Sequence, residues 1–313
     1  MTQQTIKPRP LITGPKKART PRTQRKHGDG LIALVFLLPV LLGYAIFYFW
    51  PMIRGVQISF TDWNLLSDAQ WVGFENYRRL MSDKVFGNAL VVTFTYVIVN
   101  IVTQTLLGLG IAVLMQRISQ SVFIRSLLLV PWLVPNVTIA VITLFILDPN
   151  VGLMNHLLSF MAVDPISFYG NGDIAIYTIA LVNSWRNMGY TALLLFAGMQ
   201  TIPTMVTEAA IMDGASAWRQ FRSITLPLLR PILVMVVVVS MIGSFQIFDT
   251  VSVATKGGPG HSTRVIYFYI YEKAFQQFDM GYAAAMAVVL LLILLVLSVL
   301  QMRLLRADSS DLD

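Results

Sequence analysis

Six long apolar runs, separated by shorter polar segments, restrict this chain more than any other feature of its sequence. The first run, residues 31–52, carries no charged side chain and has the ~20-residue length at which a helix crosses a bilayer. It is too long for the core of a signal peptide, and no small-residue cleavage site follows it. Transmembrane helices are predicted over residues 31–52, 89–115, 126–147, 174–199, 231–255 and 282–302. The sequence therefore predicts an all-α membrane protein with six transmembrane helices.

Composition agrees with a membrane protein and argues against several other classes. Only 12% of the residues are charged, against roughly 25% in a typical soluble domain. The chain has no cysteine, so neither disulfides nor thiolate metal sites can form. Its three histidines (His27, His156 and His261) lie far apart in sequence. We therefore expect no metal and no cofactor.

The basic residues predict that both ends of the chain are cytoplasmic. Six crossings place the two termini on one side, and that side holds fifteen of the 23 lysines and arginines, as the positive-inside rule requires. Eight of them lie in residues 1–27, a segment predicted to be a disordered tail. Orienting the first span is its favoured role, and adhesion to anionic lipid or to a partner is the alternative. Residues 28–306 are predicted to form the membrane domain and 307–313 a short C-terminal tail, and nothing in this pattern favours binding to nucleic acid.

A polar loop at residues 200–230 joins the fourth and fifth predicted spans. Its charged residues cannot lie in hydrocarbon, and it is long enough for two short helices. Gly214 is predicted to join them, because glycine readily adopts the positive φ that ends one helix before the next begins. Ala209 and Ala210 leave a smooth patch for a partner. The alternative is an ordinary solvated helix-turn-helix.

This loop resembles the cytoplasmic "EAA" loop of ATP-binding-cassette (ABC) importer permeases. The family pattern is Glu-Ala-Ala, three residues, Gly, nine residues, then Ile-x-Leu-Pro, and the chain fits it at every fixed position. The resemblance implies the type I permease fold of these importers and a loop that docks into a cleft on a separate ATPase subunit. The residues assigned to this coupling loop are Glu208, Ala209, Ala210, Asp213, Gly214, Ile224, Leu226 and Pro227.

The segment from Thr255 to Gly260 and the Tyr269-Ile270-Tyr271 triplet are similar to the carbohydrate branch of these importers, and to the first of its two permease partners. This likeness implies sugar import across a bacterial or archaeal cell membrane. It also implies a second permease subunit, two copies of an ATPase, an extracytoplasmic solute-binding protein and contact with membrane lipid. A glycerol-phosphate or another polar solute is the alternative substrate. The chain has no Gly-Lys-Ser/Thr phosphate-binding sequence, so we expect it not to be an enzyme.

Two ionisable residues, Arg186 and Asp249, fall inside predicted spans. Such groups cost about 2.5–3.5 kcal/mol at mid-bilayer on insertion scales, so they usually face a protein interior or an aqueous path. The residues assigned to a substrate path around them are Asn183, Trp185, Arg186, Asn187, Tyr190, Phe245, Gln246, Phe248 and Asp249. A structural Arg186–Asp249 pair, or polar groups that fix helix packing, is the alternative.

Two other classes of protein remain as rivals. An ion-driven secondary transporter or channel predicts inverted repeats with broken helices, or rings of charge. Neither feature is visible in the sequence, and the 200–230 loop would then have no purpose. A membrane scaffold without transport would leave the polar segments around Arg186 and Asp249 unexplained.

Overall fold

The computed structural model describes residues 27–118 and 121–304. These described residues fall into two compact units that divide between Met52 and Ile53. Apart from His27, which begins the first helix, the predicted basic tail lies outside the described residues, and so does the predicted C-terminal tail. In the first unit, α1 (His27–Tyr44) continues through the π-helical turn η1 (Ala45–Phe49) into α2 (Trp50–Ile58), whose last residues belong to the second unit.

The second unit is almost entirely helical, with one short antiparallel β-hairpin near its start. Its remaining elements are β1 (Thr61–Asp62), β2 (Gln70–Trp71), α3 (Glu75–Ser82), α4 (Lys84–Ile118), α5 (Val122–Leu133), α6 (Asn136–Ile146), α7 (Leu153–Ser159), α8 (Ala175–Met199), α9 (Thr204–Met212), α10 (Ala217–Gln220), η2 (Phe221–Thr225), α11 (Leu226–Leu228), α12 (Arg230–Phe245), α13 (Asp249–Ala254), α14 (Ile266–Tyr271), η3 (Glu272–Gln276) and α15 (Met280–Leu304).

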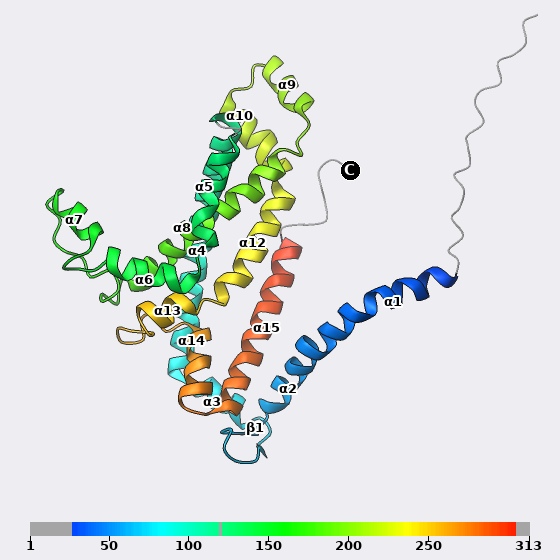
Figure 1. Cartoon of the computed structure of the whole chain (residues 1–313), viewed down its shortest axis with the longest axis vertical. Helices are drawn as coiled ribbons and strands as arrows, with labels where there is room; N and C mark the ends of the chain where they lie inside the picture. The colour runs from blue at the N-terminus through cyan, green and yellow to red at the C-terminus, as the bar shows by residue number, and fades with distance from the viewer. Residues whose placement is uncertain (1–26, 119–120, 305–313) are drawn as a thin grey trace, which may run out of the picture. The chain divides into compact units, whose positions relative to one another are not determined.

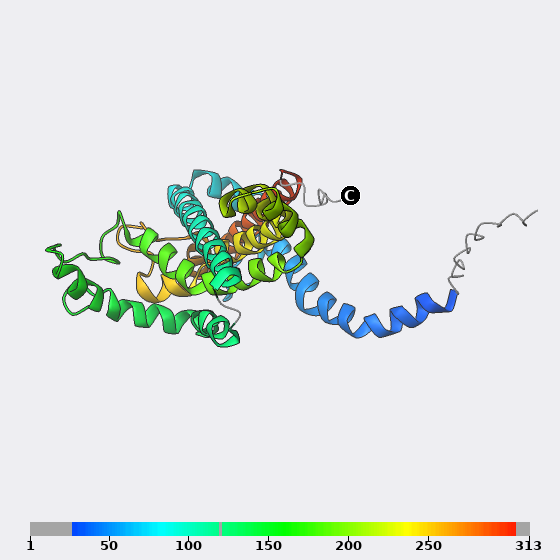
Figure 2. The same ribbon diagram turned by 90° about the horizontal axis from the view of Figure 1, so that it is seen from above.

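Helices α4, α8, α12 and α15 form the centre of this unit (Figure 1). The α4 helix packs along α8, α12 packs against both, and α15 packs against α12. Helices α9 and α10 lie at the end of the bundle opposite α3 and β1 (Figure 1), and α5 and α6 run along its flank (Figure 2). The ends of the bundle are therefore distinct, one bearing the predicted coupling loop and the other the β-hairpin.

The apolar core forms two clusters along these helices. One contains the first half of α4, the start of α8 and the largest buried rings, Phe245 and Tyr282. The other contains the last part of α4 and of α8, including Met115 and Leu195. On α4 and α8 the buried side chains between the clusters, such as Gln104 and Asn183, are polar, so the bundle has a polar layer between two apolar ones.

Four helical segments in the described residues are long and apolar enough to cross a membrane, or six if each bent helix pair counts as one span. The prediction of one continuous helix over 126–147 is wrong, because α5 and α6 meet at an angle of 90°. Val134 and Pro135 between them are extended, with ψ of 134° and 142°. A residue that precedes proline is biased away from helical conformation, so Pro135 explains the break. The fifth predicted span is also interrupted, between Phe245 and Asp249.

At the end that bears the β-hairpin, Asp83 ties three helices together. Its Oδ1 atom accepts the backbone N–H groups of Val85 and Phe86 at the start of α4, at 2.8 and 3.2 Å. Its Oδ2 atom accepts the hydroxyls of Tyr269 on α14 and Tyr282 on α15, each at 2.7 Å. Burial alone would raise the pKa of Asp83, but these hydrogen bonds outweigh burial and lower it. Asp83 therefore joins the helices as a carboxylate.

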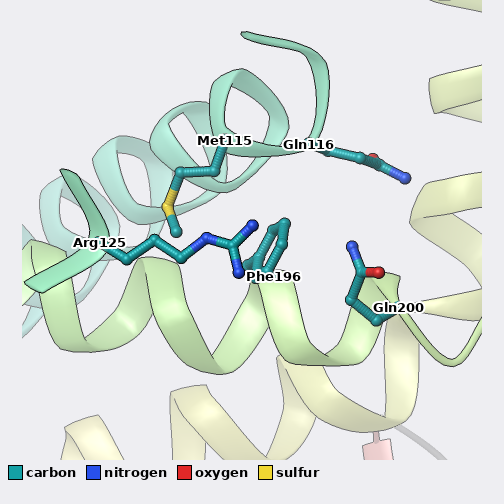
Figure 3. A pocket seen from close by; sticks show the side chains of 5 residues that line it. All are labelled: Met115, Gln116, Arg125, Phe196 and Gln200. Carbon is teal, nitrogen blue, oxygen red and sulfur yellow. The ribbon is translucent and has the colours of Figure 1, made fainter. Parts of the chain in front are cut away.

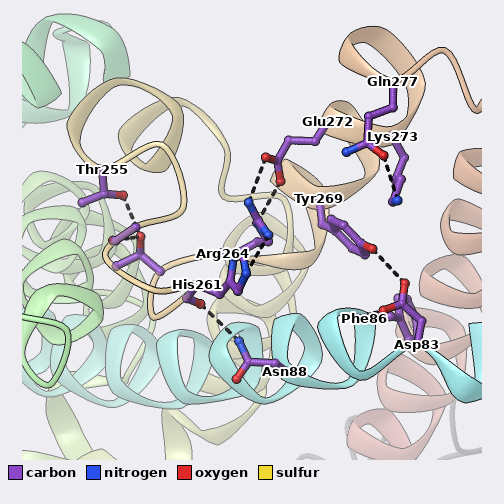
Figure 4. A network of polar contacts seen from close by, with 12 residues as sticks. Asp83, Phe86, Asn88, Thr255, His261, Arg264, Tyr269, Glu272, Lys273 and Gln277 are labelled. Carbon is purple, nitrogen blue, oxygen red and sulfur yellow. Dashed lines mark hydrogen bonds and ion pairs between the residues drawn. The ribbon is translucent and has the colours of Figure 1, made fainter.

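Ion pairs extend this network (Figure 4). Arg264 Nε lies 2.9 Å from Glu272 Oε2, and both side chains are largely buried. Arg79 Nη1 lies 2.8 Å from Asp279 Oδ2, and the Arg79 guanidinium also lies over the Tyr282 ring. The Arg264–Glu272 pair thus braces the segment between α13 and α15 internally, and the Arg79–Asp279 pair holds that segment against α3.

Candidate functional site

A cavity of about 280 Å³ opens in the polar layer of the bundle, between α4, α8 and the break that follows α12. Seven of the nine residues predicted to form a substrate path line it. They are Asn183, Arg186, Asn187, Tyr190, Gln246, Phe248 and Asp249. The other two lie elsewhere. Trp185 is 45% exposed and lies outside the cavity, and Phe245 is 1% exposed and meets the Phe94 ring edge-on in the core.

A polar face on α4 also lines the cavity and was not predicted from the sequence. Tyr96, Asn100 and Gln104 all line the cavity, and their four-residue spacing places them on one side of the helix. Asn100 Nδ2 donates to Ser244 Oγ at 2.9 Å, and Gln104 Nε2 donates to Ser240 Oγ at 3.1 Å, so both amides reach α12. The regular spacing of these polar residues within an apolar run could have predicted a polar face on this helix.

Two further lining residues come from the break between α5 and α6. Trp132 precedes the break, and its ring stacks on Tyr190 with centroids 4.7 Å apart and planes 9° apart. Asn136 begins α6, immediately after Pro135. Because sequence patterns predicted a continuous helix here, nothing in them placed these two side chains at a cavity.

Arg186 holds the end of α5 in place. Its Nε and Nη2 atoms donate to the Val134 carbonyl at 3.2 and 3.1 Å, and Nη2 also donates to the Trp132 carbonyl at 3.0 Å. The last carbonyls of a helix have no partner within the helix. Arg186 therefore supplies, from α8, the hydrogen bonds that the broken span lacks.

Asp249 holds the other side of the same break. It is the first residue of α13, and its Oδ2 atom accepts a hydrogen bond from Asn136 Nδ2 at 3.0 Å. The ion pairs found among the described residues do not include one between Arg186 and Asp249. The two charged residues instead bind opposite sides of the break. Arg186 binds the carbonyl groups before it, and Asp249 binds the side chain of Asn136 after it.

Arg186→Gln is expected to loosen the break and to lower the unfolding temperature of the purified chain. An acceptor such as the Val134 carbonyl costs about 1–3 kcal/mol when it is left unpaired away from water. Asp249→Asn is the matched control, because an amide oxygen can still accept the hydrogen bond from Asn136. If Arg186→Gln instead keeps its unfolding temperature and only transport falls, the guanidinium serves the transported molecule.

The loop between α8 and α12 has the local structure that the sequence predicts. Gly214 follows α9 with φ of +74°, as predicted. The Gly214 N–H donates to the Ile211 carbonyl at 3.0 Å and the Ala215 N–H to the Ala210 carbonyl at 2.9 Å, which is the Schellman pattern of a helix end. Ser216 then caps α10, its Oγ accepting the Arg219 N–H at 3.4 Å. The predicted pair of short helices with a positive-φ glycine between them is confirmed.

The residues assigned to coupling divide into two groups. Glu208, Ala209, Asp213 and Gly214 are exposed around the end of α9, while Ala210 is buried beneath them. The others, Ile224, Leu226 and Pro227, lie in η2 and α11, through which the chain remains helical as it runs into α12.

Large apolar side chains of the loop also face outward, which the sequence analysis did not predict. Met205, Ile211, Met212 and Trp218 are 74%, 61%, 86% and 68% exposed. The sequence did not indicate that these side chains are exposed, because an apolar residue next to a transmembrane span looks like a continuation of that span.

Comparison with known proteins identifies the family. The family model for inner membrane components of binding-protein-dependent transport systems matches residues 104–307. A probable ABC transporter permease of Bacillus subtilis is 33% identical over 90% of this chain and 98% of its own length. The trehalose/maltose transport system permease of Thermococcus litoralis is 32% identical over 87% of this chain and 92% of its own length.

A solved structure has the same fold. The crystal structure of a bacterial ABC transporter involved in the import of alginate, an acidic polysaccharide, matches 90% of this chain and 97% of its own chain, with a TM-score of 0.79 and 21% identity. The fold is thus that of a type I ABC importer permease. With the family model matching well over half of its length, this chain belongs to the inner membrane components of binding-protein-dependent transport systems.

Proposed function

We propose that this chain is the permease subunit of an ATP-driven importer and that its polar cavity carries a sugar. The observation that carries this proposal is the cavity itself, a polar space between two apolar core clusters. Amide side chains can exchange hydrogen bonds with hydroxyl groups, and aromatic rings such as Phe248 can cover the apolar face of a sugar. Relatives named for trehalose/maltose and for arabinooligosaccharide transport support a sugar as substrate.

The partners follow from the coupling loop. We propose a heterodimer with a second permease, two copies of an ATPase at the loop and an extracytoplasmic binding protein at the opposite end of the bundle. ATP hydrolysis belongs to the ATPase subunits, and both termini lie in the cytoplasm. The exposed apolar side chains around Gly214 support a docked partner, because side chains such as Ile211 and Met212 gain most from burial. Movement of the docked loop turns the cavity alternately outward and inward.

Within the cavity, we assign substrate binding to residues other than those that hold the surrounding helices together. Arg186 and Asp249 are already bonded across the α5–α6 break. Gln246 lies at the break after α12, is exposed to the cavity, and its side chain forms no hydrogen bond to any residue that the structure describes. We therefore assign sugar hydroxyl binding first to Gln246, with Phe248 beside it.

Gln246→Ala is expected to lower sugar uptake about 5- to 10-fold, because one hydrogen bond is worth roughly 1–1.5 kcal/mol. Assembly should be unchanged, since the side chain is exposed and forms no hydrogen bond to the described residues. Uptake of ¹⁴C-labelled trehalose and maltose is measured in proteoliposomes that contain the complete transporter, its binding protein and ATP. Gln276→Ala, an exposed glutamine outside the cavity, is the matched control.

The same proteoliposomes test the class of transporter. An importer of this kind requires ATP and its binding protein, whereas a secondary transporter requires only an ion gradient. The structure does contain the broken helices that a secondary transporter would show, at Val134–Pro135 and at 246–248. Uptake driven by a proton or sodium gradient without ATP would overturn the proposed function.

A further inference from the structure

We propose that a second cavity, close to the coupling loop, binds the phosphate group of an anionic phospholipid. This cavity of about 270 Å³ lies between the ends of α4, α5 and α8 (Figure 3). The described residues that line it are Met115, Gln116, Arg125, Phe196 and Gln200. Since one water occupies about 30 Å³ of liquid, the space can hold a phosphate group together with several waters.

Arg125 is the only charged side chain among the described residues that line the cavity. Arg125 is half-buried, and its guanidinium lies over the Phe196 ring with 4.3 Å between its carbon and the ring centroid. The Arg125 Nε atom is buried and has no hydrogen-bond partner among the described residues. None of the ion pairs found there involves Arg125, and the lining contains no carboxylate. A guanidinium presents a fork of N–H donors that fits a phosphate, so an anionic ligand would satisfy it.

The other lining residues fit a ligand that enters from outside. Met115 and Phe196 are 4% and 8% exposed and form an apolar floor, while Gln116 and Gln200 are exposed at the mouth. Each amide brings N–H donors for phosphate oxygens. The ligand class is therefore an anion with several acceptor oxygens.

Two features favour a lipid over free phosphate. Gln116 is the last residue of the apolar segment 84–116, so the cavity lies where that span ends. Helical spacing also places Gln116 on the same face of α4 as Leu109 and Val113. Those two residues line a separate, almost wholly apolar groove of about 690 Å³, closed on its other side by Trp218 and Phe221. A headgroup at Arg125 could thus have an acyl chain along this groove.

The position of Gln200 gives the lipid a role. Gln200 caps the end of α8, and α9 of the coupling loop begins at Thr204. A phosphate held between Arg125 and Gln200 braces the junction through which the loop is joined to the bundle. Placing this lipid in the inner leaflet, where anionic lipids are concentrated, rests on the proposed function.

The test is lipid binding to the purified full chain in neutral detergent, followed by native mass spectrometry. Phosphatidylglycerol, phosphatidylcholine and inorganic phosphate are the probes. The wild type is expected to retain phosphatidylglycerol over phosphatidylcholine, and Arg125→Gln to weaken its retention at least tenfold. Arg125→Lys should be intermediate, because it keeps the charge and loses the fork. Arg230→Gln is the control, an exposed cation at the same end of the bundle, and should bind as the wild type does.

Three results would overturn the proposal. Equal retention of phosphatidylcholine would mean that no anion is recognised, and displacement of phosphatidylglycerol by equimolar phosphate would identify free phosphate as the ligand. If the Arg125→Gln variant has a normal unfolding temperature and still binds phosphatidylglycerol as the wild type does, the lipid lies elsewhere. If the Arg125→Gln variant unfolds, binding by Arg125→Lys is the test, and retention equal to that of the wild type would overturn the proposal. ATP-driven sugar uptake is measured separately, so normal uptake without lipid binding refutes this site alone.

Discussion

Gly214→Val is expected to leave the chain in the membrane at near-normal amounts and yet to abolish sugar uptake and weaken co-purification of the ATPase. Gly214 has φ of +74° at the end of α9, where a residue with a side chain costs roughly 1–2 kcal/mol and a β-branched residue costs more. A Cβ atom there meets no other atom within 4 Å, so the cost is one of backbone conformation alone. That cost is too small to unfold the bundle, but it acts on the turn that sets the direction of the exposed loop that we propose docks to the ATPase.

A series of substitutions at Gly214 separates the effect of backbone conformation on coupling from a general loss of folding. Asparagine tolerates the left-handed region better than other residues with a side chain, so Gly214→Asn should retain more uptake than Gly214→Ala, and Gly214→Ala more than Gly214→Val. Membrane content, ATPase co-purification and labelled sugar uptake are measured for each variant. Normal co-purification and uptake with Gly214→Val would show that the loop does not couple the two subunits.

Gly189→Ala is expected to impair folding severely, although it adds only a single methyl group to the chain. A Cβ atom at Gly189 would lie 1.8 Å from the carbonyl oxygen of Leu128, so α8 and α5 touch backbone to backbone at this point. Backbone atoms cannot turn aside as a side chain can, and overpacking in a well-packed core costs about 1–3 kcal/mol or more. The helices must separate, which also displaces Arg186, one turn away, from the carbonyls of α5.

Fluorescence-detected size-exclusion chromatography of the solubilised variant provides the measurement, and a several-fold loss of the monodisperse peak is expected. Gly110→Ala is the matched control, because a Cβ atom at this helical glycine meets nothing within 4 Å. In a helix interior, alanine is favoured over glycine by up to ~1 kcal/mol. A Gly189→Ala profile as good as that of Gly110→Ala would contradict the close α5–α8 contact.

The positions of the spans could be predicted because hydropathy alone determines them. The predicted span 174–199 coincides within one residue with α8, and 282–302 lies inside α15. The breaks could not be predicted in the same way. The sequence around Pro135 is as apolar as a continuous span, and the 90° bend depends on Arg186, which lies 52 residues away from Val134. Tertiary contacts decide whether such a proline bends a helix slightly or divides it.

The candidate site was predicted best where residue type and helical spacing agree. Asn183, Arg186, Asn187 and Tyr190 follow a three- and four-residue spacing on one face of α8, and all line the cavity. Trp185 was included for its aromatic ring alone, and at about 100° per residue it projects from another face. Tyr96, Asn100 and Gln104 of α4 were not predicted, because they are regularly spaced on one face of the helix but carry no charge that draws attention to them.

The break between α5 and α6 also constrains how the chain is inserted as it is synthesised. At 1.5 Å per residue, the 12 residues of α5 and the 11 of α6 extend about 18 and 17 Å, little more than half of a ~30 Å hydrocarbon core. Neither helix can cross alone, and lipid offers no hydrogen bond to the carbonyls between them. Their donor, Arg186, emerges from the ribosome only after 52 further residues. Residues 122–199 must therefore enter the bilayer as one cooperative unit, in which Arg186 of α8 supplies the hydrogen bonds that the break between α5 and α6 lacks.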